Sequence, residues 1–221
     1  MISTHTVERL VIYRRLLKRL EKNGERWVTS RKLALILSKS PAQVRKDLSL
    51  IGRMGKPGVG YNIPALREDL ERLIGIDRSW GVALIGAGNL GRALFYYSGF
   101  RKEGFLFRAV FDADPERIGK KWEDVIIEDS SNIRSRLSEG DIHIAVIAVP
   151  ASAVQGVADK LVSAGIREML NFAPVNLRVP EDVHVRSADL AFELENLAFF
   201  LSSRDGGNPG TGDNKKNRKR V

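Results

Sequence analysis

The 221-residue sequence contains no cysteine. This absence excludes disulfides, cysteine-ligated zinc, thiol nucleophiles and redox sensing through thiols. Long apolar runs are also absent: the longest clean one, residues 144–149, has the length of a strand, whereas a membrane span needs roughly 18 residues. The first residues lack the basic and apolar regions of a signal peptide. Together these absences predict a cytoplasmic protein with no membrane partner.

Positive charge exceeds negative charge, but the excess is not spread evenly. The chain has 36 Lys and Arg against 27 Asp and Glu, which gives a net charge of +9. Residues 1–80 hold 17 basic and 8 acidic side chains, residues 81–203 hold 13 and 17, and residues 204–221 hold 6 and 2. The three segments therefore carry +9, −4 and +4. This distribution predicts parts with different partners.

The basic amino-terminal segment has the pattern of a helix-turn-helix. Residues 7–20 have helical apolar spacing, and Thr29 is placed to cap a short helix that runs through Leu37. Ser40 caps the next helix, and Gln43 is predicted to complete a capping box with it. The outward side of that helix would carry Gln43, Arg45, Lys46 and Ser49, which are residue types that read bases or hold phosphates.

A glycine-rich stretch follows this helix, with glycines at 52, 55, 58 and 60. Such spacing does not suit a helix and predicts a tight hairpin, or wing, before a helix from Pro64 to Ile74. The segment is therefore predicted to be a winged helix-turn-helix that binds DNA. The alternative is a small helical domain with a solvated basic face. The candidate DNA contacts are Ser40, Gln43, Arg45, Lys46, Arg53, Lys56 and Gly58.

The central segment contains a glycine motif between a strand and a helix. An apolar run, residues 82–85, leads into Gly86-Ala87-Gly88-Asn89-Leu90-Gly91, and a helical pattern follows. In this context G-x-G-x-x-G predicts a dinucleotide site. Asp112 ends the next strand about 20 residues on, where an acid bonds the ribose hydroxyls and disfavours a 2′-phosphate. We therefore expect NAD(H), with another nucleotide such as coenzyme A as the alternative.

Strands and helices continue to alternate after this motif, which is typical of a parallel sheet. Strands are predicted over 142–149 and 169–172, with a helix over 151–164 between them. Pro150 and Phe172 then lie at strand ends on the ligand side. No Tyr-x-x-x-Lys pair, Ser/His/acid set or metal cluster is visible, which favours a sensor over an enzyme. The alternative is a cytoplasmic NAD-dependent dehydrogenase with an accessory basic domain.

The last predicted helix covers residues 189–201 and is apolar on much of its surface. Leu190, Leu194, Leu197 and Leu201 form one stripe, which phenylalanines widen. Burial against a second subunit and packing on its own domain are both open on this pattern. From residue 204 the composition predicts a disordered basic tail.

Five segments together resemble the Rex family of redox-sensing transcriptional repressors: QVRKDLS (43–49), GVGY (58–61), GAGNLG (86–91), FDADP (111–115) and NFAPV (171–175). The resemblance extends over residues 7–203. It implies a homodimer whose winged helix binds operator DNA and whose Rossmann domain binds NAD(H). It also implies a domain-swapped carboxy-terminal helix, and a repressor that NADH releases from its operator.

The resemblance also implies roles for individual residues. The DNA contacts it implies are Arg45, Lys46 and Lys56. The cofactor contacts it implies are Gly86 to Gly91, Asp112, Pro150 and Phe172. It also implies a set of residues near the nicotinamide that couples the two sites, namely Arg15, Tyr97 and Asp189, of which Tyr97 and Asp189 would also contact the cofactor. The sequence departs from the family at residues 50–55, which lack the usual aromatics and acid. Arg53 makes this wing more basic.

The complete prediction is an α/β protein with four parts. Residues 1–80 form the winged-helix domain, 81–187 the Rossmann domain, 188–203 the dimerisation helix and 204–221 the tail. One recognition helix reads only a few base pairs, and a symmetric dimer reads two half-sites about one helical turn apart. The operator is therefore expected to be near-palindromic.

Overall fold

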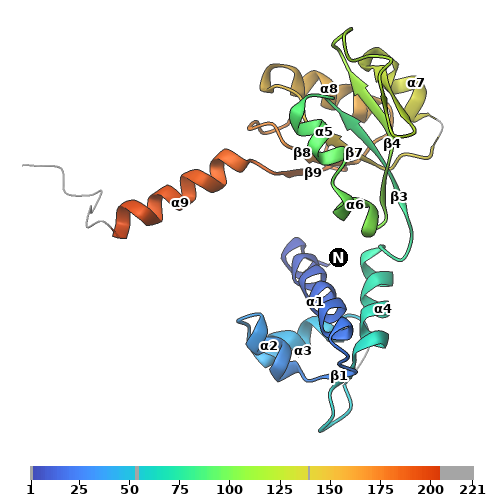
Figure 1. Cartoon of the computed structure of the whole chain (residues 1–221). Coiled ribbons are helices and arrows are strands. Elements are labelled where there is room, and N and C mark those ends of the chain that lie inside the picture. The colour runs from blue at the N-terminus through green and yellow to red at the C-terminus, as the bar shows by residue number, and fades with distance from the viewer. Residues whose placement is uncertain (1, 53–54, 139, 205–221) are drawn as a thin grey trace, which may run out of the picture. The chain divides into compact units, whose positions relative to one another are not determined.

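A computed structural model describes residues 2–52, 55–138 and 140–204 of the chain (Figure 1). The chain divides into two compact units. One comprises residues 1–79 and 102–104, and the other comprises residues 80–101 and 105–221. The candidate Arg53 and the predicted tail beyond residue 204 lie outside the described residues.

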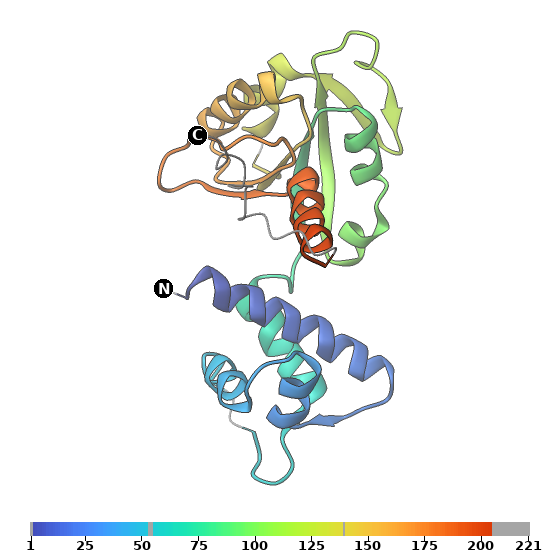
Figure 2. The same ribbon diagram turned by 90° about the vertical axis from the view of Figure 1, so that its left-hand side faces the viewer.

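The first unit is a small helical bundle with a two-stranded sheet. Its elements are α1 (Thr4–Lys22), β1 (Trp27–Val28), α2 (Ser30–Ile36), α3 (Pro41–Ser49), β2 (Tyr61–Asn62) and α4 (Ile63–Ile74). The strands β1 and β2 are antiparallel. Helices α2 and α3 form the predicted helix-turn-helix, and the hairpin between α3 and β2 projects beside it (Figure 2).

Short polar side chains fix where these helices begin. Thr29 Oγ1 accepts the Lys32 amide at 3.1 Å, and Ser40 Oγ accepts the Gln43 amide at 3.1 Å, as predicted. Such a cap satisfies an amide that has no partner within the helix. The other half of the predicted capping box, a bond from the Gln43 side chain back to the Ser40 amide, is replaced. The Gln43 side chain bonds Asp47 instead, one turn further along α3.

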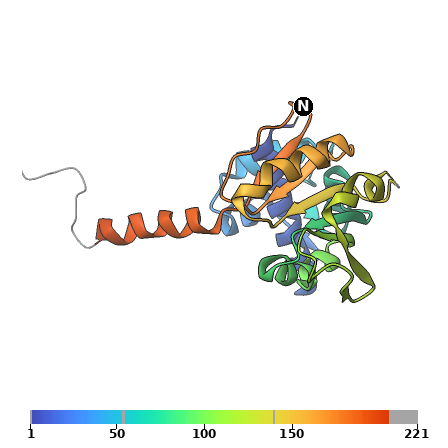
Figure 3. The same ribbon diagram turned by 90° about the horizontal axis from the view of Figure 1, so that it is seen from above.

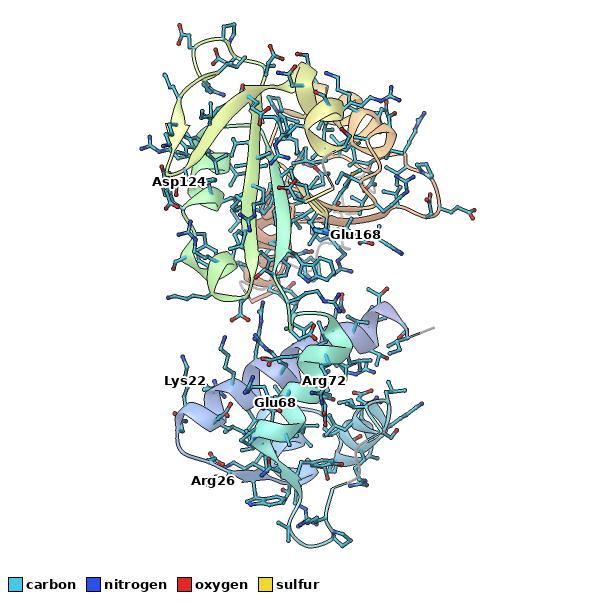
Figure 4. The ribbon with its side chains drawn as sticks, turned by 90° about the vertical axis from the view of Figure 1, so that its right-hand side faces the viewer. Lys22, Arg26, Glu68, Arg72, Asp124 and Glu168 are labelled. Atoms are coloured by element: carbon cyan, nitrogen blue, oxygen red, sulfur yellow. The ribbon has the colours of Figure 1, made fainter. Side chains whose placement is uncertain are left out.

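The core of the first unit lies between its four helices. Helices α1 and α4 run side by side, with Glu68 and Arg72 on the exposed side of α4 (Figure 4). The buried apolar side chains include Leu10, Leu17, Leu33, Val44, Leu48 and Leu66. Val44 and Leu48 anchor α3 in this core, which leaves the opposite side of α3 exposed.

The second unit is built on one seven-stranded sheet. Its strands are β3 (Trp80–Ile85), β4 (Phe105–Asp112), β5 (Lys121–Trp122), β6 (Val125–Asp129), β7 (Ile144–Ile147), β8 (Glu168–Asn171) and β9 (His184–Ser187). Their order is β5-β6-β4-β3-β7-β8-β9, and only β5 is antiparallel to its neighbour. The six parallel strands thus follow the Rossmann order 3-2-1-4-5-6.

Helices cover both faces of this sheet. They are α5 (Asn89–Phe95), α6 (Ser98–Lys102), a 3₁₀ turn at Ser130–Asn132, α7 (Ile133–Leu137) and α8 (Ala151–Ser163). The last helix of the unit, α9 (Leu190–Arg204), does not pack on the sheet. Ile133 of α7 and Val154 of α8 pack on one face, whereas Phe95 of α5 packs with Phe107 and Trp122 on the other. The predicted Rossmann-type parallel sheet is confirmed.

Helix α9 extends away from the sheet (Figure 3). Its large apolar side chains are all more than half exposed, with values from 55% to 68%: Leu190, Phe192, Leu194, Leu197, Phe199, Phe200 and Leu201. Packing on its own domain therefore does not cover this helix. None of the helices within the described ranges is long and apolar enough to cross a membrane.

Candidate DNA-binding and nucleotide-binding sites

The exposed side of α3 is basic. Arg45, Lys46 and Ser49 are exposed, because Val44 and Leu48 face the core. The guanidinium of Arg45 donates from Nη1 to Ser30 Oγ on α2 at 3.3 Å. A cationic guanidinium and ammonium on an exposed helix face suit both base edges and phosphates.

The hairpin after α3 supplies a third cation. Lys56 and Gly60 exchange backbone hydrogen bonds of 2.8 and 2.9 Å, which close the hairpin. The Lys56 ammonium lies 5.6 Å from the centroid of the Trp27 ring, a cation–π arrangement that orients it. A Cβ added at Gly60 would lie 2.3 Å from the Val28 carbonyl oxygen, so only glycine fits there.

The helix and the hairpin meet at one hollow of about 510 Å³. Arg45 and Ser49 line it from α3, Lys56 and Gly58 from the hairpin, and Ser30 from α2. Gly58 has a φ of 75° and open space around the position of a Cβ. The structure thus brings Arg45, Lys56 and Gly58 together, with Lys46 on the same helix.

Gln43 has a different position from these candidates. It lies one turn before Asp47 on α3, and its Nε2 donates to Asp47 Oδ1 at 2.8 Å. Ser40 is occupied as the cap of α3. Both residues therefore have structural partners, and neither lines the hollow between α3 and the hairpin.

Asp47 is a buried carboxylate that sequence reasoning overlooked; its side chain is only 2% exposed. Arg9 of α1 donates to it from Nε and Nη2, each at 2.7 Å, and Tyr13 donates its hydroxyl at 2.7 Å. Burial alone would raise the pKa of Asp47, but the hydrogen bonds from Arg9, Tyr13 and Gln43 lower it overall. The carboxylate is therefore held ionised between α1 and α3.

The glycine loop of the second unit has the close approaches that its motif requires. Gly86 has a φ of 102°, and a Cβ added there would lie 2.4 Å from the Ala148 carbonyl oxygen. A Cβ added at Gly91 would lie 1.9 Å from the Gly86 carbonyl oxygen. At Gly88 the space is open apart from Arg117 Nη1 at 3.8 Å. Of the three motif glycines, Gly88 is the one that faces free space, which leaves room for a pyrophosphate.

Asp112 lies beside this loop at the end of β4, as predicted. Its Oδ2 accepts the Ala87 amide at 2.6 Å and its Oδ1 accepts the Asp114 amide at 2.8 Å. Burial opposes its charge, but these amides and Arg117 outweigh burial and lower its pKa. Asp112 thus ties the glycine loop to β4. Arg117, which was not singled out from the sequence, donates from Nη1 to Asp112 Oδ2 at 3.2 Å.

A cavity of about 460 Å³ opens at the carboxyl ends of β3, β4 and β7. Its lining includes Gly88, Asn89, Leu90, Asp112, Arg117 and Pro150. This is where the strand order reverses, and such a crevice is the usual ligand position of open parallel sheets. The cavity, the open space at Gly88 and the acid at Asp112 fit a dinucleotide.

Four other candidates lie outside this cavity. Phe172 packs with the apolar cluster on the α5 face of the sheet. The Tyr97 ring is exposed and packs edge-on against Phe100 at 5.2 Å. Asp189 caps α9, since its Oδ1 accepts the amides of Ala191 and Phe192. Tyr97 and Asp189 line different hollows, and Arg15 is exposed on α1 of the first unit.

Within residues 2–52, 55–138 and 140–204, no group of three or more His, Asp or Glu side chains is arranged to hold a metal ion.

Two family models match two separate parts of the chain. Residues 1–49 match the model described as "Putative DNA-binding protein N-terminus", and residues 77–175 match a CoA binding domain. The first match covers α1 to α3, and the second covers the sheet from β3 to β8 with the glycine loop.

Curated relatives match almost the whole chain. The redox-sensing transcriptional repressor Rex of Chloroflexus aurantiacus is 44% identical over 196 residues, which cover 89% of this chain and 92% of that protein. The protein of the same name from Desulforamulus reducens is 42% identical over 204 residues, covering 92% and 97%.

Solved structures agree with these relatives. The structure of RSP in complex with β-NAD⁺ and operator DNA superposes with a TM-score of 0.89 at 34% identity, covering 93% of this chain and 94% of that one. The RSP complex with β-NADH gives a TM-score of 0.82 at 33% identity, covering 93% and 96%. RSP is described as a Rex-family repressor.

Proposed function

We propose a function from one premise: the chain belongs to the Rex family of redox-sensing transcriptional repressors. It is a transcription regulator that uses NAD(H) as its ligand, and not an enzyme. The observation that carries this function is the presence of two unlike sites in one chain, a basic helix-turn-helix and a Rossmann cavity with an acid at Asp112.

Operator DNA is bound, in this proposal, by the exposed side of α3 and the adjoining hairpin. Arg45 and Lys46 would enter the major groove, and Lys56 with Gly58 would meet the backbone. The hollow shared by Arg45 and Lys56 supports this assignment. Ser40 acts through its cap on α3, and Arg53 would add a further basic contact.

The nucleotide is held, in the same proposal, by the glycine loop from Gly86 to Gly91 and by Asp112. The loop would receive the pyrophosphate at Gly88, and Asp112 would bond the ribose while holding Ala87 in place. Pro150 would border the cavity from the other side. Phe172, Tyr97 and Asp189 would complete the nicotinamide end.

The working form is proposed to be a homodimer that pairs through α9. Seven large apolar side chains on one exposed helix favour burial against a second subunit. A domain-swapped α9 would bring Asp189 into the partner's nucleotide site and would align two recognition helices with a near-palindromic operator. The protein would work in the cytoplasm, where a repressor meets its operator.

Redox sensing follows from differential binding. NADH would bind best to a dimer whose recognition helices are misplaced, with Arg15, Tyr97 and Asp189 relaying the change. NADH can weaken operator binding only by its preference between the two conformations, and DNA must weaken NADH binding by the same factor. NAD⁺ would compete for the same cavity with less preference.

Two substitutions test this division of labour. Asp112→Ala is expected to weaken NADH binding at least about tenfold, because a charge-assisted ribose contact and the Ala87 bond are both lost. Its operator affinity without cofactor should match that of the parent. Arg45→Ala should show the reverse pattern. Calorimetry with NADH and titration of a duplex selected from a random pool measure both properties.

Equal loss of both activities in either variant would point to misfolding and would remove the support for separate sites. The other readings make different predictions. A dehydrogenase with an accessory basic domain would turn over NADH with a carbonyl substrate, and the names of the relatives do not favour it. A coenzyme A sensor would release coenzyme A on mild denaturation, as detected by mass spectrometry.

A further inference from the structure

The strongest unassigned feature of the first unit is the buried cluster between α1 and α3. Asp47 accepts four hydrogen bonds of 2.7 or 2.8 Å, two from Arg9, one from Tyr13 and one from Gln43. Arg9 and Tyr13 belong to α1, whereas Asp47 and Gln43 belong to α3. Both carboxylate oxygens are thus bonded to α1 or to the neighbouring turn of α3.

We propose that Asp47 is the positioning residue of the recognition helix: by binding Arg9 and Tyr13 it sets the placement of α3 on α1, and therefore where Arg45 and Lys46 meet the bases. Gln43 belongs to this cluster rather than to the base-reading set. The inference rests on the proposed operator binding and deepens it.

A carboxylate can fix the position of α3 because the hydrogen bonds that it accepts are directional. Val44 and Leu48 bury α3 in the core, but apolar contact is not directional and allows a helix to slide or turn. Hydrogen bonds are directional. The fork of Arg9 on the two oxygens of Asp47 also fixes the plane of the carboxylate. Slippage of α3 along or about its axis would break these bonds.

The helix geometry connects this cluster to the DNA-facing side. Arg45 and Lys46 precede Asp47 by two residues and one residue, so they point away from it around the same turn. Any rotation of α3 about its axis would shift the charged ends of Arg45 and Lys46 relative to the bases in the major groove of the operator. Gln43 lies one turn from Asp47 on the same face, where its amide donates to the carboxylate.

The test uses Asp47→Asn in the full-length chain. The amide keeps the shape of the side chain but puts an NH₂ group among four donors, so at least one donor loses its acceptor. Asp77→Asn is the matched control, since Asp77 is an exposed acid of the same unit and its loss changes net charge equally. Both variants are titrated with the selected duplex and with a scrambled duplex at fixed salt.

We expect Asp47→Asn to lower the ratio of selected to scrambled affinity by at least about tenfold. Affinity for the scrambled duplex should change as little as in Asp77→Asn, because nonspecific binding depends on charge rather than on the placement of α3. A purely structural role would lower thermal stability and leave this ratio unchanged in the folded protein, which would overturn the proposal.

Tyr13→Phe serves if Asp47→Asn does not fold, as judged by circular dichroism and NADH binding. It removes one donor and leaves the Arg9 fork, so a smaller fall in the ratio, about threefold, is expected. An unchanged ratio in Tyr13→Phe would also contradict the positioning role. If the parent chain selects no duplex from the pool, the proposed function itself fails, and this inference fails with it.

The assignment of Gln43 has a separate readout. Gln43→Met should lower affinity modestly and select the same sequence as the parent chain. Arg45→Ala should lose the preference at one position of each half-site. Loss of an adenine preference in Gln43→Met would return Gln43 to the base-reading set.

Discussion

Position 91, at the turn from β3 into α5, has no room for a side chain and therefore requires glycine. The Gly86 carbonyl oxygen lies 1.9 Å from where a Cβ would stand, so the helix and the strand pack closer than any side chain allows. Gly156 of α8 offers the contrast, because nothing lies within 4 Å of its added Cβ. The two glycines differ in surroundings but belong to the same unit.

Gly91→Ala is therefore expected to lower the free energy of unfolding of the second unit by about 1–3 kcal/mol, as overpacking does. Gly156→Ala is expected to be neutral or to stabilise by up to about 1 kcal/mol, since alanine is the better helix former. Thermal and urea unfolding of the two variants measure both effects. Similar stability of the two variants would show that α5 can move away from β3 at little cost.

Single residues differ in how far the sequence reveals them. The caps at Thr29 and Ser40 and the acid at Asp112 follow from local chemistry, and each was correctly placed from the sequence. Gln43 has the same residue type as a base reader, but its side chain donates to Asp47 of the same helix, the carboxylate that Arg9 of α1 also binds. Asp47 was missed because its partners Arg9 and Tyr13 reach it from α1 through tertiary packing. Arg117 was missed although its partner Asp112 is nearby in the sequence, because no motif marks it.

At the scale of elements, α9 differs from α5, α7 and α8 because its large apolar side chains are exposed. Leu190, Leu194, Leu197 and Leu201 form the stripe seen in the sequence, and each is at least 59% exposed in the single chain. A monomer rarely leaves such a surface in water. The exposure is the physical argument for pairing with a second subunit.

Leu197→Glu is accordingly expected to shift the protein from dimer to monomer, because a buried, unpaired carboxylate opposes association. Ser202→Glu introduces the same side chain on the same helix, on the side of Glu195 and away from the leucine stripe, and should leave the dimer intact. Sedimentation velocity at several concentrations distinguishes the two. A parent chain that sediments as a monomer would contradict the proposed dimer.

Elements with an apolar run or a cap were predictable, and those that depend on pairing were not. The helices of the first unit and strands β3, β4 and β8 lie where the sequence placed them, within a few residues. Strand β9 has the sequence His-Val-Arg-Ser and exists through its parallel pairing with β8. Strand β7 ends at Ile147, earlier than predicted. Strand formation depends strongly on such context.

The whole molecule combines two unlike surfaces in one chain. A segment of +9 contains the helix-turn-helix, and a segment of −4 contains the nucleotide cavity. The sequence has no cysteine, and the proposed sensing depends on which nicotinamide form is bound. Nucleotide binding and operator binding must therefore be coupled in free energy if the chain works as proposed.

The most direct measurement is the affinity of the full-length protein for its selected duplex, titrated with NADH and with NAD⁺ at one fixed salt concentration. Salt must be fixed because DNA affinity changes steeply with ionic strength. NADH is expected to weaken operator binding at least about fivefold, within the usual range of coupling between sites, and NAD⁺ is expected to weaken it much less. An operator affinity that NADH leaves unchanged would contradict the proposed sensing.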